Sequence, residues 1–286
     1  MIQSMTGFGK ASLQLPTKKI TVEIKSLNSK GLDLNTRMPS VFREMELGLR
    51  NQISQRLERG KVDFSLYVEV TGEETSSKIN VPIVKGYINQ MKAVIPTADE
   101  TELLKMAVRM PDALKTERDE IDENEWKQIQ TVIDEALENI ANFRKDEGAS
   151  LEKEFQLRIG NINNLMNEAV SYDAERVETV KTRLRTALDE LKVNVDENRF
   201  EQELIFYLEK YDITEEKVRL GNHLSYFLET LNGTEANGRK LGFITQEMGR
   251  EINTMGSKSN HTEMQKLVVM MKDELEKIKE QVLNVL

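Results

Sequence analysis

The sequence lacks cysteine altogether and has only two histidines in 286 residues. The absence of cysteine excludes thiol nucleophiles, disulfides and cysteine-ligated zinc, and it fits a reducing compartment. The start, Met1-Ile2-Gln3-Ser4, has neither the basic residues nor the apolar run of a signal peptide. No apolar stretch approaches the roughly 20 residues that span a bilayer. We therefore expect a soluble, cytoplasmic protein with no membrane partner, long enough for two domains.

The common catalytic motifs are also missing. We find no Walker loop, dinucleotide-binding glycine fingerprint, HExxH pair or nucleophile elbow. A serine–histidine mechanism would have only His223 and His261 as bases. His261 stands among polar residues at the start of the last amphipathic segment, so we expect it to be a solvated helix cap. A metal-free mechanism with two histidines is therefore disfavoured.

The negative charge is unevenly distributed along the chain. The net charge is −9, yet residues 1–61 hold eleven Lys/Arg against five Asp/Glu, which leaves −15 for the remainder. Such asymmetry permits a local phosphate-binding face on an acidic protein. Ordinary solvated charges are the alternative interpretation.

The first third alternates between strand and helix patterns. Apolar residues at every second position predict strands over 20–24 and 62–68. The turn at 28–31 followed by Leu32 and Leu34 predicts that a further strand forms a hairpin with the first. Between this further strand and the one at 62–68, apolar residues from Phe42 to Leu57 recur at three- and four-residue spacing. This spacing predicts a helix that Gly60 ends.

From about residue 80 the pattern is helical. One apolar stripe runs from Ile129 past Gly148 to Met166, and a second, Val177 to Leu191, predicts a helix that folds back on the first. We expect an α+β protein with an N-terminal mixed sheet-and-helix domain running into a helical arm (1–155), an arm or connector (156–198) and a C-terminal all-α domain (199–286). Whether the arm packs in cis or against another subunit is left open.

Charged residues in the last ninety positions form two groups. Glu216, Arg219 and His223 stand at i, i+3 and i+7, and so share one helical face. In the segment 238–259, Leu241, Ile244, Met248 and Ile252 form an apolar stripe, which leaves Gln246, Glu247, Arg250 and Glu251 on the face not needed for packing. Carboxylates with an imidazole suit Mg²⁺ or Mn²⁺. Exposed acidic helices with ordinary ion pairs have the same pattern.

Several motifs resemble those of the YicC/YloC family. The N-terminal Ser4-Met5-Thr6-Gly7-Phe8-Gly9 is similar to the family's opening signature, and Gly238-Arg239-Lys240-Leu241 with Gly256-Ser257-Lys258-Ser259 is similar to its C-terminal one. Matches between these ends cover nearly the whole chain. The resemblance implies an endoribonuclease that needs a divalent cation and assembles as a ring-like homo-oligomer, with a hexamer expected.

The resemblance assigns no catalytic residue, so the site residues are our hypothesis from chemistry and matched positions. The candidate catalytic residues are His223, Glu247, Arg250 and Glu251. The candidate ligands for Mn²⁺ or Mg²⁺ are Glu203, Asp212, Glu216, His223 and Glu247. The candidate RNA-binding residues are Arg37, Arg50, Arg59, Lys61, Arg219, Arg239, Lys240 and Lys258. Carboxylate-held metals activate a nucleophile, while arginine and lysine stabilise charge on the phosphorane.

The expected role is metal-dependent RNA cleavage in RNA turnover or a stress response, with RNA-degradation machinery as an expected partner. Two alternatives remain open. A non-catalytic adaptor would bind RNA through the basic face without cleaving it. A helical scaffold or assembly factor would show no salt-dependent RNA binding.

Overall fold

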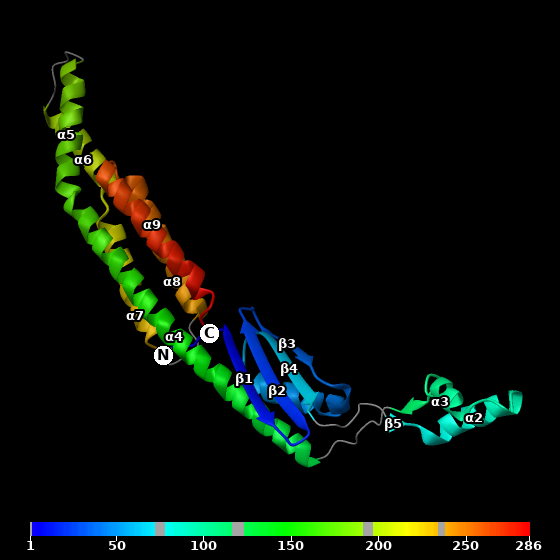
Figure 1. Ribbon diagram of the computed structural model, residues 1–286. Helices are drawn as coiled ribbons and strands as arrows, with labels where there is room; N and C mark the ends of the chain where they lie inside the picture. Colours follow the sequence, from blue (N-terminus) through cyan, green and yellow to red (C-terminus); the bar gives the residue numbers. More distant parts are fainter. Residues whose placement is uncertain (1, 72–77, 116–122, 191–196, 234–237) are drawn as a thin grey trace.

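The computed structural model describes residues 2–71, 78–115, 123–190, 197–233 and 238–286. These residues form an α+β fold, as expected: a four-stranded mixed sheet with helices, one long helix and a helical C-terminal part (Figure 1). The elements are β1 (Gly7–Gln14), β2 (Lys18–Leu27), β3 (Leu32–Arg37), the 3-10 helix η1 (Ser40–Met45), α1 (Glu46–Arg56), β4 (Gly60–Val70), β5 (Lys78–Ile79), α2 (Val81–Val94), α3 (Glu100–Ala107), β6 (Leu114–Lys115), α4 (Glu123–Ser171), α5 (Asp173–Glu190), α6 (Glu197–Tyr211), α7 (Thr214–Leu231), α8 (Gly238–Lys258) and α9 (Thr262–Val282).

The strand order of the four-stranded sheet is β1-β2-β4-β3. β2 pairs antiparallel with β1 and β4, and β3 pairs parallel with β4. The predicted hairpin between the strands at 20–24 and 32–34 is therefore wrong, although both strands exist. β4 occupies the position beside β2 because its register with β2 runs the full length of that strand, from Lys18↔Val70 to Leu27↔Lys61. The shorter β3 is left at the outer edge.

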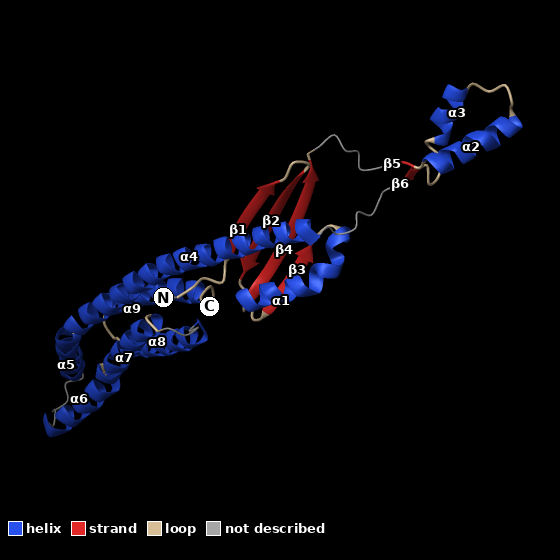
Figure 2. Ribbon diagram, turned by 90° about the horizontal axis from the view of Figure 1, so that it is seen from below, coloured by secondary structure: helices blue, strands red, loops and turns tan. Residues whose placement is uncertain are grey.

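One face of this sheet is buried and the other is uncovered. Ile20, Val22 and Ile24 of β2 pack with Val62, Phe64 and Leu66 of β4. Figure 2 shows α1 and α4 on this same side of the sheet. The predicted helix supplies Phe42, Leu49, Ile53 and Leu57 to the same core. The side chains between these positions, such as Lys25 and Tyr67, point to the opposite face, which no described element covers.

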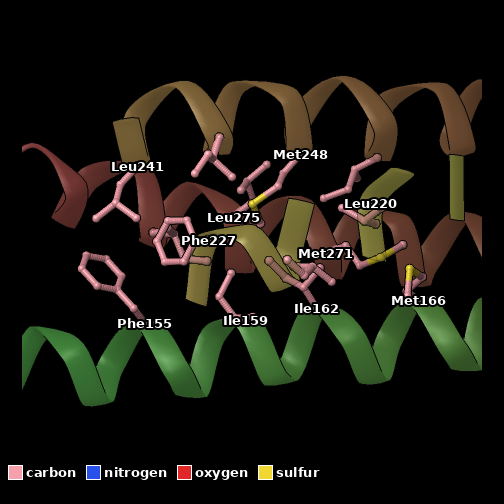
Figure 3. Close-up of a cluster of buried hydrophobic side chains, with 14 of the residues drawn as sticks. Phe155, Ile159, Ile162, Met166, Leu220, Phe227, Leu241, Met248, Met271 and Leu275 are labelled. Carbon is pink, nitrogen blue, oxygen red and sulfur yellow. The ribbon is translucent and has the colours of Figure 1, made fainter. Parts of the chain in front are cut away.

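Helix α4 belongs to two cores at once. Its first half packs Ile129, Ile133 and Ile140 against the sheet. Its second half packs Phe155, Ile159, Ile162 and Met166 against α7, α8 and α9, where Leu220, Phe227, Leu241, Met248, Met271 and Leu275 complete the interior (Figure 3). The helix continues without a break across residues 155 and 156. The sheet unit and the bundle are therefore built on one shared helix.

The second predicted stripe forms α5, and the direction of the chain there differs from our expectation. Val177, Val180, Leu184 and Leu188 are partly buried, whereas Leu191 lies outside the described residues. Helix α5 continues beyond the end of α4 rather than folding back on it (Figure 1). It is α6 that runs beside α5, where the Arg185 guanidinium lies 5.4 Å from the centre of the Phe200 ring.

The first residues of the chain tie the sheet unit to the bundle. Ser4 forms a β-bridge with Val285, and the Met5 amide donates to the Asn284 carbonyl at 2.7 Å. Nearby, buried Arg144 of α4 donates from Nη2 to the carbonyls of Met5 at 3.1 Å and Arg59 at 3.2 Å. Burial lowers the pKa of the Arg144 guanidinium. Three segments distant in sequence therefore meet at this arginine.

Residues 78–115 form a small separate unit. Strands β5 and β6 pair antiparallel, and Val84, Ala107 and Ala113 form a core between α2 and α3. Figures 1 and 2 both show this unit away from the sheet and the bundle. None of the helices in the described part of the chain is both long and apolar enough to cross a membrane.

Candidate active site

Helices α7 and α8 pack against each other through their apolar stripes. Leu220, Leu224 and Phe227 of α7 are buried, and so are the predicted stripe residues Leu241, Ile244, Met248 and Ile252 of α8. Because apolar residues fill the interior of the bundle, the charged positions of both helices lie at the edge of their contact or on the surface. We call the line along which the charged edges of α7 and α8 meet the α7–α8 seam.

An ion pair joins the two helices across the seam, and its carboxylate is buried. Lys258 Nζ lies 2.7 Å from Glu216 Oε1, and only 6% of the Glu216 side chain is exposed. Glu216 Oε2 is buried and has no hydrogen-bond partner among the described residues. A buried carboxylate is costly unless it is paired, so this contact holds the ammonium of Lys258 at the seam. It joins the first turn of α7 to the last turn of α8.

The same register brings His223 and Glu251 to one level of the seam. The two helices are antiparallel, because Glu216 at the start of α7 meets Lys258 at the end of α8, and Tyr226 further along α7 meets Lys240 at the start of α8. Two turns along α7 from Glu216 is His223, and two turns back along α8 from Lys258 is Glu251. His223 is half-buried, and Glu251 is 9% exposed. The seam therefore presents two carboxylates, one imidazole and one ammonium. We had placed Glu251 on the face not needed for packing, and this is wrong because Glu251 is buried at the helix contact.

The other predicted residues of these helices are more exposed. Arg250 Nη1 lies 2.8 Å from Glu247 Oε1, with 72% of the arginine side chain exposed. Arg219 forms an ion pair with Glu215 one turn earlier on α7. Both arginines therefore lie on the surface beside the seam, with their charges partly neutralised.

Two predicted metal ligands come before α7 in the chain. Glu203 is exposed on α6. Asp212 Oδ1 accepts from the Thr214 amide at 3.0 Å and from the Thr214 hydroxyl at 2.7 Å, which stabilises the start of α7. In the parts of the chain that the structure describes, no three His, Asp or Glu side chains come together as a cation site. The described residues of one chain therefore form no cation site with three such ligands, whereas Mg²⁺ is commonly held by one or two carboxylates together with water and substrate phosphate.

Two predicted RNA-binding residues stand at the opposite end of α8. Arg239 and Lys240 are exposed in its first turn, and Lys240 Nζ lies 4.7 Å from the centre of the Tyr226 ring on α7. A cation over an aromatic face is a common way to hold a lysine in place. These cations therefore lie on the same helix pair as the seam.

The predicted basic residues of the N-terminal unit separate into two groups. The Arg50 guanidinium binds Glu46 Oε1, the Leu34 carbonyl and the Thr36 hydroxyl, each at 2.9 Å. Arg59 Nε donates to the Ser29 carbonyl at 2.9 Å. Both arginines therefore make structural contacts, whereas Arg37 and Lys61 are exposed on the uncovered face of the sheet.

His261 is a helix cap, as we predicted, but it is not solvated. Its Nδ1 accepts from the Met264 amide at 3.4 Å at the start of α9. The ring stacks on Tyr172 at 5.2 Å between centroids, and only 14% of the side chain is exposed. The ring of Tyr172, just after the end of α4, covers the imidazole that we expected to face solvent.

The uncovered face of the sheet has a pocket that we did not predict from the sequence. Glu23, Lys25, Arg37, Asp63, Ser65 and Tyr67 line it, and of these only Arg37 was a candidate. The period-two pattern that identified Ile20, Val22 and Ile24 as buried also assigns Glu23 and Lys25 to the opposite face. That signal was therefore present in the sequence, but it did not specify which strands lie side by side.

The fold and the seam together define an α+β protein in which a sheet unit and a helical bundle share one long helix and an ionic seam lies at the bundle surface. The chain belongs to the YicC-like endoribonuclease family. A family model described as "Endoribonuclease YicC-like, N-terminal region" matches residues 2–153, and one described as "Endoribonuclease YicC-like, C-terminal" matches residues 169–286.

Two relatives are similar to the chain over its whole length. A protein of Clostridioides difficile named "Probable endoribonuclease YicC" is 33% identical over 293 residues, with 100% of both chains covered. A protein of the same name from Haemophilus influenzae is 29% identical over 287 residues, with 99% of each chain covered. The family resemblance seen in the sequence is therefore confirmed.

Proposed function

We propose that this chain is an endoribonuclease that cleaves RNA phosphodiester bonds at the α7–α8 seam. The names of its full-length relatives support the reaction class. The observation that carries the location is the seam itself, where the buried Glu216–Lys258 pair fixes a register that sets His223 level with Glu251. Such a set provides proton transfer and phosphate stabilisation in one place.

Each residue of the seam has a role in this proposal. His223 donates or accepts the proton at the attacking or leaving oxygen, and Glu251 orients the imidazole. Lys258, held by Glu216, stabilises negative charge on the phosphorane. Arg219 and Arg250 lie beside the seam, where their guanidinium groups are able to exchange a surface carboxylate for an RNA phosphate.

The roles proposed above assign no residue to the divalent cation that the family resemblance leads us to expect. No three His, Asp or Glu side chains come together among the described residues of one chain, so the roles above are assigned to protein groups alone. Dependence of cleavage on Mn²⁺ or Mg²⁺ is the expectation from the family, and it is tested by adding either ion or EDTA.

The test is cleavage of a labelled, structured RNA by purified full-length protein with Mn²⁺, with Mg²⁺ or with EDTA. We expect His223→Ala and Glu251→Gln each to lower the cleavage rate at least about 100-fold, because proton transfer contributes about that much or more. We expect Lys258→Ala to weaken both cleavage and binding of RNA.

Two variants serve as controls. His261→Asn replaces the other histidine while keeping a side chain that caps α9, and Glu229→Gln changes an exposed acid of α7 away from the seam. Both are expected to cleave as the native protein does. Cleavage that survives His223→Ala and Glu251→Gln would place the site elsewhere. RNA binding without cleavage in any condition would favour the adaptor.

We also propose that copies of the chain assemble, with a hexamer as the expected state, and that the activity serves RNA turnover or a stress response. Large exposed apolar side chains on the small unit support assembly: Val94 is 79% exposed and Ile95 57%. Light scattering coupled to size-exclusion chromatography tests this. A hexamer would give six times the chain mass of 32.9 kDa.

A further inference from the structure

The uncovered face of the four-stranded sheet carries its own pattern of rings and charges. Reading across the sheet in register, Phe8 lies beside Lys25 and Lys25 beside Asp63. In the next row, Lys10 lies beside Glu23, Glu23 beside Ser65 and Ser65 beside Arg37. Tyr67 follows in the row after that. These residues come from all four strands.

The pocket on this face is small and polar. It has a volume of about 170 Å³ and is lined by Glu23, Lys25, Arg37, Asp63, Ser65 and Tyr67. Pockets for drug-sized ligands are typically about 300–1,000 Å³, so this one has room for a single flat ring system. Tyr67 is 48% exposed and offers a ring for stacking.

The charges of the pocket favour a base over a phosphate inside it. Lys10 Nζ lies 2.9 Å from Glu23 Oε1, and Asp63 Oδ1 accepts from Asn35 Nδ2 at 3.0 Å. The hydrogen bond from Lys10 lowers the pKa of Glu23, so this carboxylate accepts hydrogen bonds and repels a phosphate. Each carboxylate retains lone pairs for a ligand that donates N–H groups.

Two exposed cations of the pocket are placed to bind the phosphate of a nucleotide whose base is in the pocket. Arg37 is exposed at the end of β3, and it makes no hydrogen bond or ion pair with any residue that the structure describes. Lys25 is 61% exposed, lies 3.9 Å from Glu23 Oε2 and stands over the Phe8 ring. Both cations of the lining are more exposed than the two carboxylates, which matches a nucleotide with its base inward and its phosphate outward.

We propose that this pocket binds one unpaired RNA base that carries an exocyclic amino group, stacked on Tyr67, with its amino group donating to Asp63 or Glu23 and its phosphate on Arg37. This rests on the proposed function, because it adds a subsite for the same substrate. The sheet and the helices of the α7–α8 seam are separate parts of the molecule in Figure 1, and the pocket is on the sheet face opposite α4. The subsite therefore holds RNA without taking part in cleavage.

Binding of short oligonucleotides in EDTA tests the subsite separately from cleavage. The probes are fluorescein-labelled 2′-O-methyl decamers of cytidine or of uridine, measured by anisotropy with the full chain. Cytidine has the amino group and uridine lacks it, so we expect the native protein to bind the cytidine decamer about fivefold more tightly or better.

Four variants locate the binding. Tyr67→Ala is expected to weaken binding of the cytidine decamer about tenfold through loss of stacking, whereas Tyr67→Phe keeps the ring and the affinity. Asp63→Asn is expected to bring the two decamers within twofold of each other. Phe143→Ala, which removes a ring 47% exposed on α4, should have no effect. Circular dichroism confirms that each variant is folded.

The results of these binding and cleavage measurements test the base-binding subsite and the nuclease activity separately. If Tyr67→Ala binds both decamers as the native protein does, the subsite is overturned, and cleavage that depends on His223 still supports the nuclease. If the native protein shows the cytidine preference through Tyr67 and Asp63 but never cleaves RNA, the subsite stands and the nuclease is overturned. Equal affinity for the two decamers would overturn the base preference.

Discussion

Glu274 of α9 shows how single charged residues hold the bundle together. Its carboxylate accepts from Lys277 Nζ at 2.9 Å and from Asn161 Nδ2 of α4 at 2.9 Å, and Arg158 Nη1 of α4 lies 3.3 Å away. Burial raises the pKa of Glu274, but the hydrogen bonds from Lys277, Asn161 and Arg158 outweigh it, so the pKa is lowered overall. The ionised form is therefore the one that joins α9 to α4.

This network makes the stability of the protein depend on pH in a defined direction. Because the folded state lowers the pKa of Glu274 below its usual value of 4.5, the carboxylate stabilises the fold above that pH, and the contribution is lost as the pH falls through the lowered pKa. We expect Glu274→Gln to lower the free energy of unfolding at pH 7 by about 2 kcal/mol, and the difference from the native protein to shrink below pH 4.5. Urea denaturation at a series of pH values measures it.

A control for this prediction lies two residues away. Glu276 is 63% exposed in its pair with Lys279 at 3.2 Å, so Glu276→Gln should change the free energy of unfolding by less than about 0.5 kcal/mol at any pH. An equal loss of stability for both variants would show that the α4–α9 network has no special role.

At the scale of elements, the contact between β1 and α4 depends on a glycine. A Cβ built on Gly9 would lie 2.2 Å from the Ala136 carbonyl oxygen and 2.8 Å from the Ile140 amide nitrogen. Both are backbone atoms of α4, which cannot rotate away as a side chain would. Gly9 therefore lets the strand and the helix approach closely enough to close the sheet core.

We predict that Gly9→Ala lowers the free energy of unfolding by about 1–3 kcal/mol, because the added methyl group forces α4 away from β1. Gly31→Ala is the matched control, since a Cβ there meets nothing within 4 Å. Urea denaturation of both variants measures the difference. A Gly9→Ala protein as stable as Gly31→Ala would mean that α4 shifts at no cost.

The elements also show what sequence patterns are able to specify. Period-two and helical spacing predicted β2, β4, α1 and the buried stripe of α8. This is possible because the spacing of apolar residues within a single segment shows which face of a strand or helix is buried. The pairing of β3 with β4 was not predicted, since it depends on whether β3 or β4 pairs with the free edge of β2. In the candidate site, spacing brought Glu216 and His223 to one face. It did not predict the Glu216–Lys258 pair, which needs the register between two helices.

At the scale of the whole molecule, α4 makes the sheet unit and the bundle depend on one another. The single tryptophan, Trp126, lies at the start of α4 and stacks on Phe42 at 5.8 Å, so its fluorescence reports on the sheet unit. Far-UV circular dichroism reports mainly on the helices. A helix that runs unbroken from one core into the other should make the two units unfold together.

We predict that Ile162→Ala, at a buried position of the bundle, lowers the free energy of unfolding by about 2–5 kcal/mol. Because Ile162 shares α4 with Trp126, the shift should appear equally in tryptophan fluorescence and in circular dichroism, although the sheet core is untouched. Leu157→Ala on the same helix is the control, since Leu157 is 56% exposed and its removal should cost less than about 0.5 kcal/mol. A fluorescence transition that stays at the native position, while the circular dichroism transition moves, would show that the two cores unfold independently and that α4 breaks between them.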